Sequence, residues 1–191
     1  MQKDKTQSIP STYPNKRKSR EDTGSGNTFS PECKKSKQMN NEKKNQQCFE
    51  TIEIASDGNC LFRAILYCLF RDDSLYSNLR EDVCKYMLGN RKTFESYLRN
   101  TETLDSDFDT YIKKMTVNKV WGGLAEVHAA ALLLHFNYAI YLPDKNVPFV
   151  KQTPFPNEIT IYLQFKNGNH FNSLMLPDKK IKIQLKKKTG R

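Results

Sequence analysis

The chain has 191 residues and a formal net charge of +10, with 31 Lys and Arg against 21 Asp and Glu. This length gives room for one domain with its own hydrophobic core, plus flanking tails. No apolar stretch reaches the roughly 18 residues of a membrane-spanning helix, and the polar N-terminus is unlike a signal peptide, so we expect no membrane insertion.

The positive charge belongs to the two ends of the chain. Residues 1–48 hold 11 basic and 5 acidic residues, residues 179–191 hold 7 basic residues and no acids, and 13 basic and 16 acidic residues remain between them. We therefore predict a basic tail over 1–48, a nearly neutral domain over 49–177 and a second basic tail over 178–191. Basic tails suit an import receptor or an anionic partner, although they most often only stay solvated.

The first 48 residues contain few large apolar side chains, so burial cannot offset the entropy of ordering them, and we predict a disordered segment. Its Lys16-Arg17-Lys18 and Lys34-Lys35-Ser36-Lys37 clusters resemble a split nuclear import signal. The five cysteines are odd in number and form no CxxC pair, which disfavours a disulfide scaffold or a zinc knuckle. An intracellular location, cytoplasmic or nuclear, follows as the expectation.

The first predicted elements of the domain are a short strand over residues 49–54, a turn over 56–59 and a helix from Cys60 to Phe70. Nearly every position of this helix is apolar, which is typical of a helix buried on most sides. Cys60, Arg63 and Tyr67 share one stripe that we expect to face solvent, whereas Cys68 should point into the core.

Three more helices are expected, over residues 75–88, over 91–99, and from Trp121-Gly122-Gly123 to about Phe136. Cys84 should pack beside the buried stripe of the first of these helices. The acidic run 105–109 is interpreted as a loop. His128 and His135 on the last helix could bind a metal, but without an HExxH pattern or a cysteine partner their spacing favours two half-buried, hydrogen-bonded histidines.

The C-terminal part alternates apolar and polar residues. It predicts a strand over residues 137–142, a long loop over 143–156, and a hairpin made of strands 159–165 and 170–176. His170 and Asn172 then project to the same side of their strand. The Asn172 amide oxygen can hold the imidazole, fix its tautomer and aim its other nitrogen at a nucleophile.

Cys60 stands where a turn becomes a helix, and the unpaired amides and positive dipole end there favour a thiolate. A thiolate, an imidazole and an amide in the order Cys60, His170, Asn172 also follow the order of papain-like proteases.

Three motifs together resemble the ovarian-tumour (OTU) family of cysteine proteases. They are Asp57-Gly58-Asn59-Cys60-Leu61-Phe62-Arg63-Ala64, then Trp121-Gly122-Gly123 with Glu126, and finally Gly168-Asn169-His170-Phe171-Asn172-Ser173-Leu174. The resemblance covers about residues 50–177. It implies a papain-like α/β (α+β) fold with a small central sheet flanked by helices, preceded here by the disordered basic tail.

The same resemblance implies hydrolysis of isopeptide or peptide bonds at the C-terminus of ubiquitin or a ubiquitin-like protein, without a metal or organic cofactor. By position, Cys60 is the nucleophile, His170 the general base and acid, Asn172 the orienting residue and Asp57 the acidic residue of the preceding loop. Amides of that loop and of Cys60 would form the oxyanion hole. We expect a monomer.

Two positions depart from the family pattern, since many relatives carry Asp in place of Asn172 and Tyr in place of Phe171. Asn cannot stabilise an imidazolium by charge, which leaves more of that task to Asp57. For Asp57 a turn or helix-cap role competes with a direct catalytic one. The alternatives are a weak or inactive OTU-like module that binds ubiquitin, which the intact catalytic set disfavours, and a nucleic-acid protein, which the nearly neutral domain disfavours.

Overall fold

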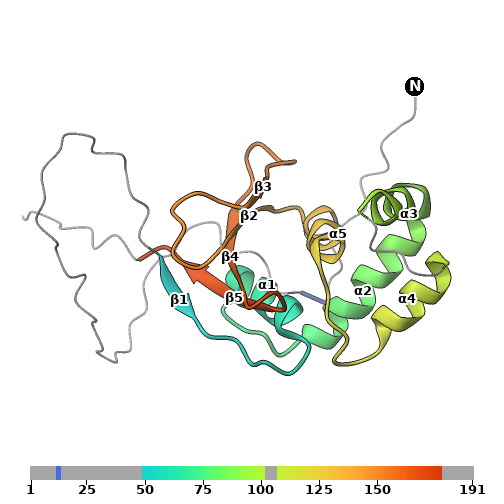
Figure 1. Cartoon of the computed structure of the whole chain (residues 1–191), viewed down its shortest axis with the longest axis horizontal. Coiled ribbons are helices and arrows are strands. Elements are labelled where there is room, and N and C mark those ends of the chain that lie inside the picture. The colour runs from blue at the N-terminus through green and yellow to red at the C-terminus, as the bar shows by residue number, and fades with distance from the viewer. Residues whose placement is uncertain (1–11, 14–48, 102–106, 178–191) are drawn as a thin grey trace, which may run out of the picture.

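Five helices and a five-stranded mixed sheet form the part of the chain that the structure, a computed structural model, describes: residues 12–13, 49–101 and 107–177 (Figure 1). The elements follow in the order β1 (Glu50–Ile52), α1 (Cys60–Phe70), α2 (Tyr76–Gly89), α3 (Arg91–Asn100), α4 (Phe108–Thr116), α5 (Leu124–Leu134), β2 (Asn137–Tyr141), β3 (Val150–Gln152), β4 (Thr160–Lys166) and β5 (His170–Met175). The predicted class, a small sheet flanked by helices, is confirmed.

The sheet has the strand order β1-β5-β4-β2-β3, in which β2 and β4 run parallel and the other neighbours antiparallel. The predicted hairpin is β4–β5, with Lys166 opposite His170 and Gln164 opposite Asn172. Asn167 and Gly168 in its turn have φ of 56° and 73°, a left-handed conformation that Asn and Gly adopt at low cost. The hairpin therefore places His170 at the turn end of β5.

Helix α1 spans the predicted residues Cys60–Phe70, and most of its side chains are buried. It packs against β5 and β4. Ser173 in β5 donates its hydroxyl to the carbonyl of Ala64 in α1 at 3.0 Å. Because α1 begins at Cys60 and lies on the strand that begins at His170, this packing sets the two candidate catalytic residues in relation to each other.

The helices predicted over residues 75–88 and 91–99 are confirmed as α2 and α3 with ends shifted by one residue. Cys84 is buried as expected. On the buried side of α2, however, Arg80 lies among the apolar residues with only 2% of its surface exposed. A charged side chain so deep requires hydrogen-bond partners, which lie in the site described below.

The prediction of a loop over 105–109 is wrong at its end, because helix α4 begins at Phe108. Residues 105 and 106 lie outside the described residues. Asp107 caps this helix, and its carboxylate accepts the Thr110 backbone N–H at 3.0 Å. Lys113 and Lys114 stand in the last turn, where positive charge complements the helix dipole. The acids therefore mark the beginning of a helix.

Two other predictions needed correction. The segment 143–156 is not entirely loop, because β3 pairs with β2, and the Phe149 amide donates to the Ile140 carbonyl at 2.7 Å. Helix α5 ends at Leu134 rather than near Phe136, since His135 adopts a left-handed conformation with φ of 54°. His135 is thus the cap of α5 and not part of its continuous face.

Most of the predicted N-terminal tail and all of the predicted C-terminal tail, 178–191, lie outside the described residues. Within the described dipeptide 12–13, Tyr13 is buried against the domain. Its hydroxyl donates to Asp82 Oδ2 at 2.9 Å, and its ring stacks on Phe70 with 6.3 Å between centroids. Among the helices of the described part, none combines the length and apolar character needed to span a bilayer.

Candidate active site

Cys60 is the first residue of α1 and follows a tightly held turn. Asp57 Oδ1 accepts the Asn59 backbone N–H at 2.9 Å. Gly58 has φ of +81°, and a Cβ at this position would lie 2.2 Å from the Lys119 carbonyl oxygen. Only glycine fits this close approach, so Gly58 is required for the turn before the candidate nucleophile Cys60.

The predicted exposure of Cys60 is wrong, because the residue is only 5% exposed. Its stripe neighbours Arg63 and Tyr67 are half-buried. Arg63 is held by Asp57 and Asp73, at 2.9 and 3.1 Å, and its guanidinium lies 3.7 Å from the centre of the Tyr76 ring. Ion pairs and a ring contact at Arg63 therefore cover this side of α1.

The other two described cysteines differ from Cys60 in position. Cys68 is half-buried rather than part of the deep core, and its thiol lies 3.4 Å from the Tyr162 carbonyl oxygen. Burial raises the pKa of Cys68 to about 11 and that of Cys84 to about 12. Both stay protonated near neutral pH, so neither competes as a nucleophile.

His170 and Asn172 contact each other as predicted. His170 Nε2 lies 2.9 Å from Asn172 Oδ1, and the same oxygen accepts the Ile54 backbone N–H at 3.0 Å. Because this second bond fixes the oxygen end of the amide, Nε2 must carry the proton. Nδ1 of the neutral imidazole then carries the lone pair that accepts a hydrogen, as a general base requires.

The structure brings Cys60 and His170 to one cavity of about 320 Å³. Its lining residues are Ser56, Gly58, Cys60, Trp121, Lys166, Asn167, Asn169 and His170. The partner of His170 Nδ1 is the Ser56 hydroxyl, at 3.2 Å, and not the Cys60 thiol. Before the thiol proton can be transferred to His170, Nδ1 must therefore lose its hydrogen bond to the Ser56 hydroxyl and gain one from the Cys60 thiol.

Asp57 has a different set of partners from that of the imidazole. Its carboxylate binds Arg63 at 2.9 and 3.0 Å and the Asn59 amide. Burial acts to raise the pKa of Asp57, but the hydrogen bonds from Arg63 and Asn59 outweigh it and hold the pKa below its usual range. These contacts support the turn role of Asp57 over direct contact with His170.

Arg80 is a site residue that the sequence reasoning missed. Its Nη2 donates to Asn59 Oδ1 at 2.8 Å and to the Gly58 carbonyl at 3.2 Å, while Nη1 donates to the Met115 carbonyl at 2.9 Å. Helical spacing places Arg80 on the same buried stripe of α2 as Val83, Cys84 and Met87. A charged residue on an otherwise apolar stripe is unusual, and this was the feature of the sequence that could have identified Arg80 as a site residue.

The Glu126 carboxylate holds the end of the Trp121-Gly122-Gly123 segment at the start of α5. This buried carboxylate accepts the Gly123 amide at 2.6 Å and the Tyr111 hydroxyl at 2.7 Å. Burial raises the pKa of Glu126. A Cβ on Gly122 would lie 2.8 Å from a Leu61 methyl group, so this loop packs closely on α1 beside Cys60.

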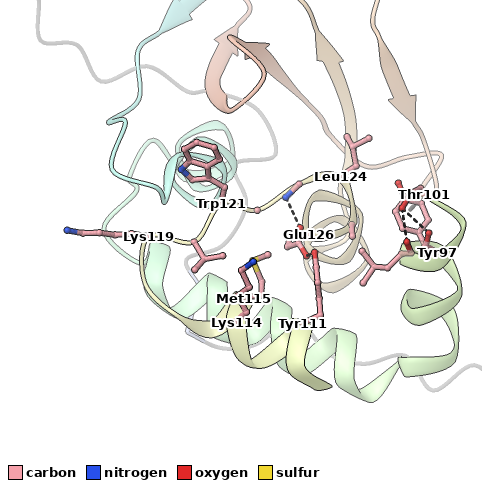
Figure 2. Close-up of a pocket in the computed structure, with 14 residues that line it drawn as sticks. Tyr97, Thr101, Tyr111, Lys114, Met115, Lys119, Trp121, Leu124 and Glu126 are labelled. Carbon is pink, nitrogen blue, oxygen red and sulfur yellow. Dashed lines mark hydrogen bonds between the residues drawn. The ribbon is translucent and has the colours of Figure 1, made fainter. Parts of the chain in front are cut away.

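Trp121 is 60% exposed and lines the cavity that holds Cys60 and His170 together with two neighbouring cavities. The larger neighbour, of about 640 Å³, is bounded by α3, α4 and the loop leading into α5. Figure 2 shows Lys119 and Trp121 at one end of it and Tyr97 and Thr101 at the other. The single tryptophan of the chain thus stands where the three cavities meet.

The two histidines of the α5 region lie apart from this site. His128 packs between aromatic rings, with Tyr97 stacked at 6.4 Å, and burial lowers its pKa. His135 contacts Phe155, with 5.0 Å between ring centroids. Within the residues that the structure describes, no group of three or more His, Cys, Asp or Glu is placed to hold a metal ion.

Comparison with known proteins agrees with this geometry. A family model described as OTU-like cysteine protease matches residues 55–171. The Arabidopsis thaliana protein named OVARIAN TUMOR DOMAIN-containing deubiquitinating enzyme 7 is 28% identical over 123 residues, which are 64% of this chain and 32% of that protein. The chain therefore spans about a third of this relative.

Two solved structures are similar in fold. The OTUD1 OTU domain has a TM-score of 0.57 at 21% identity, and the match covers 66% of this chain and 85% of that one. An OTU domain solved in complex with ubiquitin has a TM-score of 0.52 at 28% identity, and the match covers 66% of this chain and 69% of that one.

Proposed function

This chain belongs to the OTU family of cysteine proteases, and from that membership and the site geometry we propose that it is a thiol-dependent deubiquitinase. Its substrates would be isopeptide or peptide bonds at the C-terminus of ubiquitin or a ubiquitin-like protein. The observation that carries the proposal is that Cys60 and His170 line one cavity while Asn172 holds the far nitrogen of the imidazole.

The reaction begins with transfer of the Cys60 proton to His170 Nδ1, the nitrogen that the Asn172 contact leaves unprotonated. The thiolate attacks the carbonyl carbon of the terminal residue of ubiquitin and forms a tetrahedral oxyanion. His170 then protonates the leaving lysine amine as the C–N bond breaks. In the second half, His170 removes a proton from water as the water oxygen attacks the thioester carbonyl carbon. Collapse of this second tetrahedral intermediate breaks the C–S bond, releases the C-terminal carboxylate of ubiquitin and returns the His170 proton to the Cys60 sulfur.

The oxyanion would be held by backbone amides at the start of α1. The Asn59 amide already donates to Asp57, so we assign this role to the amides of Gly58 and Cys60. The Cys60 amide lies in the first turn of α1, where intrahelical acceptors are lacking and the helix dipole also favours negative charge.

A narrow substrate tail fits the surroundings of the cavity. An adjoining apolar cavity of about 250 Å³ runs past the glycines Gly122, Gly123 and Gly168, with Trp121 and Phe149 at its sides. The glycines lack side chains and so allow a close approach to an extended peptide backbone. The complex of ubiquitin with an OTU domain similar to this chain supports ubiquitin as the partner.

One observation favours a second candidate, a weakly active or inactive module that binds ubiquitin. The Ser56 hydroxyl occupies His170 Nδ1 at 3.2 Å, where the thiol proton must go. If Ser56 is not displaced when substrate binds, the chain would recognise ubiquitin without cutting its conjugates.

A ubiquitin probe with a C-terminal electrophile tests the proposal, because covalent capture needs both recognition and a reactive thiolate. We expect wild-type protein to form a stable adduct and Cys60→Ala to form none. Cys68→Ala and Cys84→Ala should still react and serve as matched controls. Labelling that persists in Cys60→Ala would contradict the assignment of the nucleophile, and tight binding of ubiquitin without capture would identify the inactive module.

The thiols and the basic tails bear on where the protein works. Cys60, Cys68 and Cys84 are free thiols, which suits a reducing compartment, and we infer an intracellular protein, cytoplasmic or nuclear. The basic tails would bind an import receptor or an anionic partner. Fluorescence microscopy of the whole chain and of a chain lacking residues 1–44 tests both statements together.

A further inference from the structure

Glu53, directly after β1, contacts the same amide that orients His170. Its Oε2 accepts the Asn172 side-chain N–H at 3.0 Å and the Lys166 ammonium at 2.8 Å. Asn172 Oδ1 in turn accepts the N–H of His170 Nε2 at 2.9 Å. A continuous chain of hydrogen bonds therefore runs from a carboxylate, through one buried amide, to the imidazole.

We propose that Glu53 is a positioning residue for the thiol hydrolase reaction, which through Asn172 supplies the negative charge that an asparagine in the orienting position lacks. The inference rests on the proposed function and adds a fourth member to its set of residues. Glu53 lies in a segment outside the motifs that suggested the nucleophile and the base.

The geometry gives Glu53 control over the orientation of the amide. Asn172 is fully buried, so its two N–H groups need acceptors inside the protein. Apart from Glu53, the acceptor within reach is Gln164 Oε1 at 3.4 Å, which is a weak contact. A hydrogen bond to an ionised carboxylate is roughly twice as strong as a neutral one, so Glu53 is the acceptor that keeps Oδ1 pointing at His170.

The charge of Glu53 also acts on the imidazolium that forms during catalysis. An N–H that donates to a carboxylate is polarised, which makes the oxygen of the same amide a better acceptor for Nε2–H. The effect is partly offset, because Lys166 neutralises Glu53 and stands opposite His170 in the hairpin. The other titratable group that lines the cavity with His170, apart from Lys166, is the Cys60 thiol, and its thiolate also favours the imidazolium.

The Lys166 hydrogen bond is the main reason that the pKa of Glu53 lies below its usual range, with a smaller contribution from Asn172. Glu53 is therefore ionised throughout the neutral range in which the reaction would run. Its side chain is 67% exposed, so water screens its direct Coulomb interaction with His170. The path through the amide carries the larger part of the effect.

Two measurements on the whole chain test the proposal. One is kcat/KM on a fluorogenic ubiquitin substrate against pH, and the other is the rate of Cys60 alkylation by iodoacetamide against pH, followed by mass spectrometry. Glu53→Gln keeps an acceptor but loses the charge. We expect the alkaline limb of the kcat/KM profile to move about 0.3 to 0.5 pH units lower, because the imidazolium loses a stabilising charge. The acid limb of the alkylation profile, which follows formation of the thiolate, should move about as far higher, because the imidazolium that stabilises the thiolate is itself less stable. We also expect kcat/KM to fall about 3-fold to 10-fold.

Glu50→Gln is the matched control, because it removes a carboxylate from β1, the strand just before Glu53, at a position opposite Met175. Its profiles should coincide with those of the wild type. Glu53→Ala, which removes both acceptor and charge, should lower kcat/KM further than Glu53→Gln. Identical profiles for wild type and Glu53→Gln would overturn the proposal.

The Asn172→Asp background separates a positioning role from a general structural one. An ionised carboxylate in place of the amide cannot donate a hydrogen bond to Glu53, and the two carboxylates would repel each other. Glu53→Gln should then raise kcat/KM or leave it unchanged, in contrast to the loss expected with Asn172. An equal fall in kcat/KM in both backgrounds would contradict a role of Glu53 that acts through the Asn172 amide. Alkylation needs no ubiquitin and therefore tests the positioning role separately from the proposed function. If the wild type shows the expected alkylation profile but does not process ubiquitin, the proposed function is refuted and the role of Glu53 is not.

Discussion

Arg80 donates to the side-chain oxygen of Asn59 at 2.8 Å and so connects α2 to the residue before the candidate nucleophile. The same guanidinium lies 4.4 Å from the centre of the Phe62 ring in the first turn of α1. Asn59 Oδ1 also accepts the Lys119 backbone N–H at 3.1 Å. The turn that presents Cys60 is therefore held between α2 and the loop that leads to Trp121.

Arg80→Lys should reduce catalysis because a lysine ammonium cannot reproduce the fork that bonds Asn59, Gly58 and Met115 together. We expect kcat/KM to fall about 10-fold to 100-fold and the free energy of unfolding to fall by about 1 to 3 kcal/mol, as buried carbonyls lose donors. Urea denaturation and turnover of a fluorogenic ubiquitin substrate measure the two effects. Arg99→Lys, at an exposed ion pair, should change stability by less than about 0.5 kcal/mol. Unchanged kinetics in Arg80→Lys would show that the turn holds its shape without the fork.

Asn172→Ala should lower kcat/KM by about 10-fold to 100-fold, which corresponds to a loss of roughly 1.4 to 2.7 kcal/mol of transition-state stabilisation. The reason is that His170 Nε2 loses its 2.9 Å partner and the ring is no longer oriented. Asn172→Asp should be tolerated and raise activity if its charge stabilises the imidazolium. His170→Ala should be far more damaging than either. Full turnover in Asn172→Ala together with loss in Asp57→Ala would transfer the orienting role to Asp57.

Glu126→Gln should stabilise the protein above pH 5. Burial raises the folded pKa of Glu126, so this group's contribution to stability is fully present below its unfolded pKa of about 4.3 and is lost as pH rises through the folded pKa. A neutral amide at this position retains an oxygen acceptor and avoids burying a charge. Thermal melts from about pH 4 to about pH 8 should show the Tm advantage of the variant growing with pH. A constant difference in Tm would mean that Glu126 does not titrate in this way.

A protein that begins at Asn45 should keep its turnover of ubiquitin substrate within a few-fold, because the described part of the N-terminal segment contacts the domain at Tyr13, against α1 and α2 and away from the cavity. Its Tm should nevertheless fall, since loss of a buried tyrosine costs about 1 to 2 kcal/mol. Tyr13→Ala in the whole chain should lower the Tm by the same amount. A large loss of turnover in the truncated protein would show that the tail helps to form the substrate site.

Residues whose chemistry is local could be predicted from the sequence. The α1 helix follows from an unbroken apolar run after a turn, and the β4–β5 hairpin follows from period-two alternation around Asn167 and Gly168. The contact of His170 with Asn172 is a consequence of strand geometry, which puts residues two apart on one face. For these features, near neighbours in the sequence decide the structure.

The features that could not be predicted depend on distant contacts. Ser56 and Glu53 contact His170 and Asn172 across more than one hundred residues, and nothing in their immediate surroundings marks them. The burial of Cys60 could not be predicted because helical periodicity shows only which residues share a stripe. It does not show that Arg63 on this stripe binds Asp57, Asp73 and Tyr76, which shield this side of α1 from solvent. Helix α4 was missed because the acidic residues before it were interpreted as loop composition rather than as a cap.

Trp121 is the only tryptophan in the chain, and it lies exposed where the cavity of Cys60 and His170 meets its two neighbours. Its indole is consequently an intrinsic optical reporter at the site itself. Any ligand that enters one of these cavities changes the polarity around a single emitting group, so the emission spectrum of unlabelled protein reports occupancy without background from another tryptophan. Stopped-flow fluorescence of Cys60→Ala with intact conjugates would resolve the arrival of substrate separately from the chemistry that follows it.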